Sequence, residues 1–198
     1  MRSVLTLVIG ALIIFAFATL VVVVVPYHEL KPVTAPAGLK PYTLAELRGR
    51  STYVAMGCVY CHSQQPRPAS LAPDQQRGWG RASVPGDYVY DYPHLLGTAR
   101  TGPDLFNIGA RQPSIDWHLA HLYQPRSVSP GSVMPSYPFL FRVERRPSTG
   151  EKKVALPPQY SPSGGEVVAT QEALDLVAYL LALNHTYPLA AESQETTP

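Results

Sequence analysis

The only two cysteines of the chain lie three residues apart, in the stretch Cys58-Val-Tyr-Cys61-His62. A redox-active or disulfide pair of this kind is expected to begin a helix directly after a strand. A zinc site needs two further nitrogen or sulfur ligands, and the chain has no second cysteine pair. The third kind of site is covalent c-type haem, for which C-x-x-C-H is the signature, because each thiol bonds to one vinyl group and the histidine binds the iron. The spacing favours haem, so we expect the chain to fold around a flat ring.

The ligand opposite His62 decides what such a site can do. An iron with an open position binds gases or performs chemistry, whereas an iron with both axial positions filled transfers electrons. Met56 lies only two residues before Cys58, too close to reach across the ring, but Met134 lies in a loop stiffened by prolines. We therefore predict that His62 and Met134 are the axial ligands of one covalent haem c. His121 is the rival for the second position, and a gas sensor with an open site is the corresponding functional alternative.

Residues 3–25 contain no charged side chain, and as a helix they would span about 34 Å, enough to cross a bilayer. The apolar core of a cleaved signal peptide is shorter, about 7–15 residues, so a retained anchor is the preferred interpretation. Arg2 is the only charge before the span, and it favours a short cytoplasmic end. We predict a single-pass protein of the cell inner or plasma membrane, with the remaining chain on the periplasmic (extracytoplasmic) side.

Four segments are expected along the 198 residues. Residues 1–26 form the transmembrane anchor, which Pro26 closes. Residues 27–41 form a proline-stiffened linker, residues 42–188 a haem domain, and residues 189–198 a flexible tail. The formal net charge of +2 gives no electrostatic footprint for nucleic acid, so no nucleic-acid partner is expected. The 21 prolines, about twice the average share, indicate long ordered loops.

Three helices are predicted in the domain, and each begins at a capping residue. The capping box Thr43-x-x-Glu46 opens a helix that leads to the cysteines. The other two helices span 113–126 and 170–184. Their expected N-caps are Ser114 and Thr170. The residues of the middle helix that are expected to face inward are Ile115, Leu119 and Leu122.

The segment 139–156 alternates apolar and charged residues around Pro-Ser-Thr-Gly, which predicts a small β-hairpin. Its basic residues indicate a solvated ribbon, with docking onto a partner or lipid head groups as the alternative. His118 and His121 are i,i+3 neighbours that could bind a metal, although a hydrogen-bonding pair beside the core is the simpler interpretation. The expected fold class is mainly α, with a single N-terminal transmembrane helix, long proline-rich loops and this small hairpin.

Three longer stretches are more specific than the cysteine motif. They are GCVYCHSQQPRP (57–68), YDYPHLLGTARTGPDL (90–105) and DWHLAHLYQPRSVSPGSVMPSY (116–137). Together they resemble the monohaem, membrane-anchored cytochrome c subunit of cbb3-type haem–copper oxidases, the subunit II called CcoO or FixO. A first helix that ends in the haem motif and a last helix that crosses it is similar to the frame of class I cytochromes c.

The resemblance implies a set of haem-binding residues. They are Cys58 and Cys61 for covalent attachment, His62 and Met134 as proximal and distal iron ligands, Pro103, Arg100 and Arg126. The carbonyl of Pro103 would accept the imidazole N–H of the proximal histidine, which fixes the ring and strengthens it as a donor. Arg100 and Arg126 would face the haem propionates or a partner.

The resemblance also implies a function as an electron relay. The haem would take electrons from a donor c-type cytochrome and pass them to the haem b of a polytopic haem–copper catalytic subunit, in a terminal oxidase that reduces oxygen. The partners implied are this subunit, the donor and membrane lipid. The same role in a nitric oxide reductase-type complex and an autonomous anchored shuttle are the alternatives. The chain offers no copper site or acid–base pair, so it is not expected to be catalytic on its own.

Overall fold

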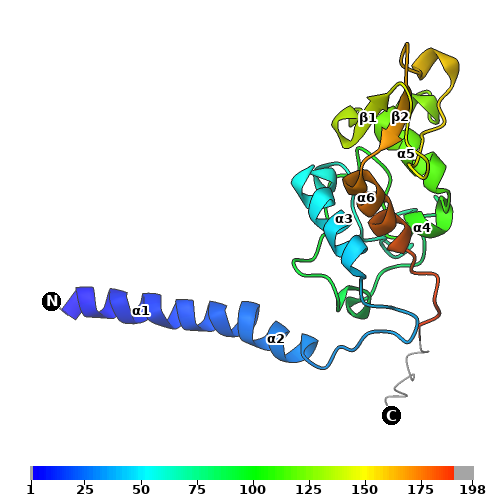
Figure 1. Cartoon of the computed structure of the whole chain (residues 1–198). Coiled ribbons are helices and arrows are strands. Elements are labelled where there is room, and N and C mark those ends of the chain that lie inside the picture. Colours follow the sequence, from blue (N-terminus) through cyan, green and yellow to red (C-terminus); the bar gives the residue numbers. More distant parts are fainter. Residues whose placement is uncertain (1, 190–198) are drawn as a thin grey trace.

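The structure, a computed structural model, describes residues 2–189. A long N-terminal helix projects from a compact part, called the head below, which contains α3 to α6 and both strands (Figure 1). The α-helices are α1 (Arg2–Thr19), α2 (Val25–Leu30), α3 (Leu44–Ala55), α4 (Ile108–Arg111), α5 (Ile115–Tyr123) and α6 (Gln171–Ala182). The strands are β1 (Phe141–Glu144) and β2 (Glu166–Ala169). The mainly α class, with one N-terminal helix, one small antiparallel sheet and prolines in the loops, is confirmed.

The apolar run at the N-terminus forms one helix, Ser3–Leu30, that is long and apolar enough to cross a membrane. The rest of the chain does not cover its side chains. A π-helical segment, Leu20–Val24, joins α1 to α2, and Pro26 lies in the first turn of α2, where proline is tolerated. The expectation that Pro26 closes the helix is therefore wrong, because the helix continues to Leu30.

The predicted linker, 27–41, does not stand free of the head. A Cβ placed on Gly86 of the head would lie 2.9 Å from the carbonyl oxygen of Thr34 and 3.2 Å from the ring of Pro36. A Cβ on Gly38 would lie 2.6 Å from the ring of Tyr187. The connection between the long helix and the head is thus packed rather than loose. The segment boundaries remain predictions, and the tail predicted at 189–198 lies outside the described residues apart from its first.

Helices α3 and α6 cross at the centre of the head (Figure 1). Gly49 permits the close crossing, because a Cβ there would overlap the carbonyl of Asp175 and lie 2.9 Å from the Cα of Leu176. Beside this contact, the buried rings of Tyr53 and Tyr179 meet edge to face with their centroids 5.4 Å apart. The crossing carries the end of α3, and with it the cysteine motif, into a fixed position.

The three predicted N-caps are confirmed. The Thr43 hydroxyl accepts the Glu46 N–H at 3.3 Å while the Glu46 carboxylate accepts the Thr43 N–H at 2.6 Å. The hydroxyls that cap α5 and α6 belong to Ser114 and Thr170. Helix α5 is shorter than predicted because its C-cap is extended and a separate turn follows. Leu119 and Leu122 are buried as expected, but Ile115 is 45% exposed, so its inward placement was wrong.

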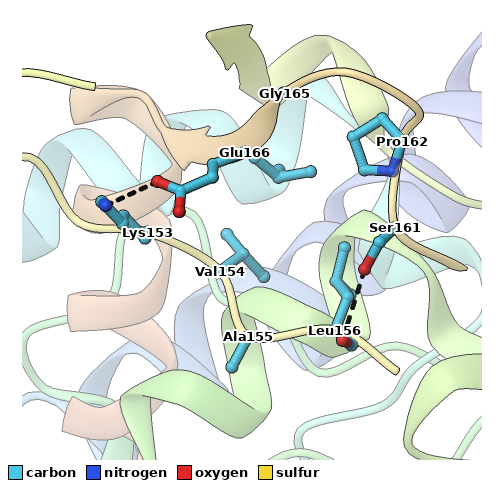
Figure 2. A pocket seen from close by; sticks show the side chains of 9 residues that line it. Lys153, Val154, Ala155, Leu156, Ser161, Pro162, Gly165 and Glu166 are labelled. Atoms are coloured by element: carbon cyan, nitrogen blue, oxygen red, sulfur yellow. Dashed lines mark hydrogen bonds and ion pairs between the residues drawn. The ribbon is translucent and has the colours of Figure 1, made fainter. Parts of the chain in front are cut away.

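The small sheet differs from the predicted hairpin. Strand β1 pairs antiparallel with β2, with Phe141 opposite Ala169 and Glu144 opposite Glu166, while residues 151–156 contribute only a bridge from Lys153 to Val168. The Lys153 ammonium pairs with the Glu166 carboxylate at 2.5 Å, beside a small pocket between 153–156 and 161–167 (Figure 2). The turn signal in 139–156 was real, but the closing strand comes from further along the chain.

The long loops between α3 and α4 are held by three ion pairs. Their carboxylates are buried, and each guanidinium lies within 3.0 Å of its partner. The pairs are Arg50–Asp91, Arg81–Asp87 and Arg100–Asp74. Since desolvation offsets much of the attraction in a buried pair, these contacts chiefly select one loop conformation.

Candidate haem-binding site

The cysteine pair lies where α3 gives way to a short 3-10 helix, Cys58–Tyr60. The backbone N–H of His62 donates to the carbonyl oxygen of Cys58 at 3.0 Å, which ties the histidine to the motif. Burial raises the pKa of the Cys58 thiol to about 11, whereas a redox-active pair needs a thiol of lowered pKa. The pair also follows a helix rather than a strand. Both observations speak against the redox-pair interpretation.

The imidazole of His62 is held from behind by the loop 101–105. Its Nδ1 lies 2.7 Å from the carbonyl oxygen of Pro103. Since a carbonyl can only accept, Nδ1 carries the proton and Nε2 presents its lone pair. Burial lowers the pKa of His62, which favours the neutral ring. A neutral imidazole with one nitrogen oriented and the other available is typical of a metal-ligating histidine.

Met134 lies in a loop that α5 holds in place. The thioether is half-buried against the core, and three residues later the Tyr137 N–H donates to the carbonyl oxygen of Leu122 at 2.9 Å. Burial raises the pKa of Tyr137, and electrostatic interactions with Cys58 and Cys61 raise it further. Tyr137 is therefore within electrostatic reach of both cysteines, and Met134, Tyr137 and Cys58 all pack against the same core.

The two histidines of α5 have different surroundings. His118 is buried, and its Nε2 lies 2.8 Å from the carbonyl oxygen of Gln112. The ring of His121 stacks on Trp117 with centroids 4.6 Å apart, and its Nδ1 is buried with no partner within residues 2–189. Burial, with smaller effects from the neighbouring histidines His118 and His62, lowers the pKa of His121 to about 4. His118 is thus the hydrogen-bonded residue beside the core, while His121 has an unpaired nitrogen in electrostatic reach of His62.

A site made only of ordinary metal ligands finds no support. In the part of the chain that the structure describes, no three His, Cys, Asp or Glu side chains gather so as to hold a metal ion. The zinc interpretation therefore lacks its ligands. The groups that do come together are two thiols, a neutral imidazole and a thioether-bearing loop, and this donor set fits a haem held by two thioether bonds.

The comparison with protein families decides between the remaining interpretations. The family model FixO, described as cytochrome c oxidase, mono-haem subunit, matches residues 1–160. The chain belongs to the FixO family. A search of curated proteins gave no match.

FixO membership confirms the resemblance found in the three quoted stretches, all of which lie inside the matched region. It makes the chain a mono-haem subunit of the cytochrome c oxidase type. The match ends at residue 160, before β2 and α6. The second strand and the last crossing helix of this FixO chain therefore lie beyond the matched region, although α6 is needed to complete the core.

Arg100, one of two arginines expected at the haem propionates, is engaged elsewhere. Its guanidinium contacts Asp74 at 2.8 Å, the Ser63 hydroxyl at 3.1 Å and the carbonyl oxygen of Gln65 at 2.9 Å. Arg126 is exposed on the 3-10 helix Pro125–Ser127. Arg100 thus holds the loop that follows the motif, and for both arginines a propionate contact remains a prediction.

Sequence reasoning missed Arg111, at the end of α4. One of its N–H groups donates to the carbonyl oxygen of Asp104, but its Nε is buried without a hydrogen bond in the described chain. Its charge also lowers the pKa of His62, so it lies on the histidine side of the site. An unpaired buried donor on a cation fits a carboxylate group such as a haem propionate. A lone arginine after a short apolar stretch offered no sequence signal.

Asp104 was also missed, although it directly follows Pro103. Its carboxylate accepts the Ser63 hydroxyl at 2.5 Å and the N–H groups of Gln65 at 2.8 Å and Phe106 at 2.9 Å. These bonds join the residues after His62 to the loop behind it. A sequence signal for this role was available, because an aspartate carboxylate often accepts a hydrogen bond from the backbone N–H two residues later and so stabilises a turn.

Replacing Gly102 with alanine tests the support behind His62. A Cβ at this position would overlap the imidazole, with Nδ1 and Nε2 2.7 Å away, so the ring and Pro103 must separate. We expect Gly102→Ala to keep its haem but to become partly high-spin, and the reduced protein to bind carbon monoxide. Visible and electron paramagnetic resonance spectra measure this. The control is Gly131→Ala, where a Cβ meets nothing within 4 Å. Identical low-spin spectra for both variants would contradict the assignment of His62.

Proposed function

We propose that the chain is a membrane-anchored electron relay that passes electrons from a donor c-type cytochrome to the haem b of a haem–copper catalytic subunit that reduces oxygen. The observation that carries the proposal is the pair Cys58 and Cys61 followed by His62, whose ring the Pro103 carbonyl orients, in a chain of the FixO family. Haem c, when bound, supplies a one-electron iron couple and needs no proton-transfer group beside it.

Each residue of the site has a separate task in this proposal. Cys58 and Cys61 hold the haem covalently. Burial keeps His62 neutral and the Pro103 carbonyl orients its ring, so that Nε2 is presented without rearrangement. Met134 would close the site against water and small ligands, and the hydrogen bond from Tyr137 to Leu122 ties its loop to α5.

The proposed location is the extracytoplasmic face of the cell membrane, with Ser3–Leu30 as a single-pass anchor. The packed connection between anchor and head supports a fixed subunit rather than a mobile shuttle. Thr34 and Pro36 lie against Gly86, and Tyr187 lies against Gly38 while its hydroxyl donates to Asp87 at 2.8 Å. A head that swings between partners would need a linker without such contacts.

Extraction with a mild detergent tests this function. We expect the full chain to co-purify with a polytopic subunit that contains haem b and copper, in stoichiometric amounts. Isolation of the chain alone would favour the shuttle instead. Co-purification with haem b in the absence of copper would favour the nitric oxide reductase-type alternative.

A further inference from the structure

A cleft of about 540 Å³ lies where the long helix meets the head. Leu30 at the end of α2 and Val33 just beyond it form one wall, and the loop that contains η3 (the 3-10 helix Pro85–Tyr88) forms most of the other. In Figure 1 this loop lies on the side of the head nearest to α2. The apolar residues that line the second wall are Val84, Pro85, Tyr88, Val89, Tyr92 and Leu96.

The position of the cleft along the helix places it at the level of lipid head groups. The run of aliphatic residues ends at Val25, and Leu30 lies five residues further along a continuous helix, which is about 7.5 Å at 1.5 Å per residue. The head-group layer of one leaflet is roughly 5–8 Å thick, the difference between the whole bilayer and its hydrocarbon core divided by two. If the anchor spans the bilayer as proposed, Leu30 and the cleft lie at its outer surface.

The orientation of this surface is fixed by the packed connection described above. Gly86, in the turn beside the cleft, rests against Thr34 and Pro36, which lie just beyond the end of α2. The cleft therefore cannot rotate away from the bilayer without breaking these contacts. With Leu30 in its wall, the cleft stays beside the end of the anchor.

The exposed side chains around the cleft have the chemistry of a membrane interface. Tyr92 is 90% exposed, Tyr27 60% and Tyr90 40%, and Val89 beside them is 43% exposed. Tyrosine is enriched at the membrane–water boundary because its ring is apolar and its hydroxyl polar. Lys31, next to Leu30, is exposed and is in none of the ion pairs of residues 2–189, so its ammonium is available to a phosphate.

We propose that this cleft binds a phospholipid of the outer leaflet, with the part of an acyl chain nearest the glycerol between the end of α2 and residues 84–92, and with its phosphate near Lys31. The proposal rests on the anchoring in the proposed function, because only a spanning helix brings the cleft to this depth. A lipid is favoured over a protein segment because the aliphatic side chains of the lining match an acyl chain. The polar lining residues Gln65, Ser83 and His94, with the Tyr92 hydroxyl, match the glycerol region, and the ammonium of Lys31, which neighbours Leu30, matches the phosphate. Bound in this way, lipid would fix the height of the head above the membrane.

The test uses the full chain in native membranes, with Tyr92→p-benzoylphenylalanine as a photoreactive probe. After irradiation, mass spectrometry of the chain is expected to show an adduct of one phospholipid. The matched control Phe139→p-benzoylphenylalanine lies beside β1, is 63% exposed and should give severalfold less lipid adduct. When Lys31→Glu is combined with the probe at position 92, the amount of phospholipid adduct should fall.

Either a polypeptide adduct at position 92 or no adduct at all would overturn the proposal. A polypeptide adduct would show that the cleft is a docking site for another subunit. A third probe, Phe15→p-benzoylphenylalanine in the middle of α1, separates this failure from failure of the anchor. Lipid adducts at 15 but not at 92 would leave the proposed function standing and reject the lipid site. No lipid adduct at 15 would reject the anchor itself and the lipid site with it.

Discussion

Replacing Met134 with alanine is expected to leave haem c attached, to lower its midpoint potential and to abolish turnover of the oxidase complex. The attachment survives because both cysteines are unchanged. The potential falls because a thioether stabilises ferrous iron relative to water or an empty position. We expect a fall on the order of 0.1 V or more, within the roughly 0.8 V over which axial ligands can set haem potentials.

A redox titration of the isolated variant measures this fall, and carbon monoxide added to the reduced protein shows whether the distal position has opened. The control is Met56→Ala, which removes the methionine at the end of α3 and should change neither result. If Met134→Ala kept the original potential and still excluded carbon monoxide, the distal ligand would be another residue. His121, with its buried unpaired nitrogen, would then be the first to examine.

Replacing Cys61 with alanine is expected to prevent stable accumulation of the protein. The side chains around the motif are apolar but only partly buried by the rest of the chain, among them Cys58, Val59, Met134 and Tyr137. A porphyrin would cover them, and burial of apolar surface is the main source of folding free energy. The three buried ion pairs of the loops do not replace this contribution, because the cost of desolvation offsets their attraction.

Immunoblots and haem staining of membranes measure the effect, with a nearly complete loss expected for both signals. Tyr60→Ala is the matched control, since Tyr60 lies inside the motif but is 79% exposed, and it should accumulate normally with haem. Normal amounts of haem-free Cys61→Ala protein would show that the loops fold without the cofactor.

The sequence allowed many features to be predicted because their causes are local. The helix starts at Thr43, Ser114 and Thr170 each depend on a hydroxyl and an N–H three residues away, and all three were predicted correctly. The cysteine motif is equally local, and the long apolar run needs only its length and composition. The family was also predictable, because it rests on residues quoted directly from the chain.

The errors came from features whose causes lie elsewhere in the chain. The hairpin signal in 139–156 identified β1 but not its partner, because a strand pairs with whichever segment the fold brings alongside it. Pro26 is a local exception: it has the properties of a helix terminator, yet it lies in the first turn of α2 after a π-helical segment, and the helix continues. The loop partners of Arg100 were not predictable either, because they lie on a distant segment, here the one that carries Asp74, while its contact with a haem propionate stays a prediction.

Sequence by itself determined that this protein has an apolar helix of membrane-spanning length, a two-cysteine haem motif, capped helices and FixO membership. Only the tertiary structure decided that Arg111 and Asp104 stand on the histidine side of the site, that β2 completes the sheet, and that the linker is packed against the head. The physical reason is the sequence separation over which each interaction acts. Capping, attachment motifs and hydropathy act between neighbours in the chain, whereas buried charges and strand partners depend on groups far apart in sequence that only folding brings together.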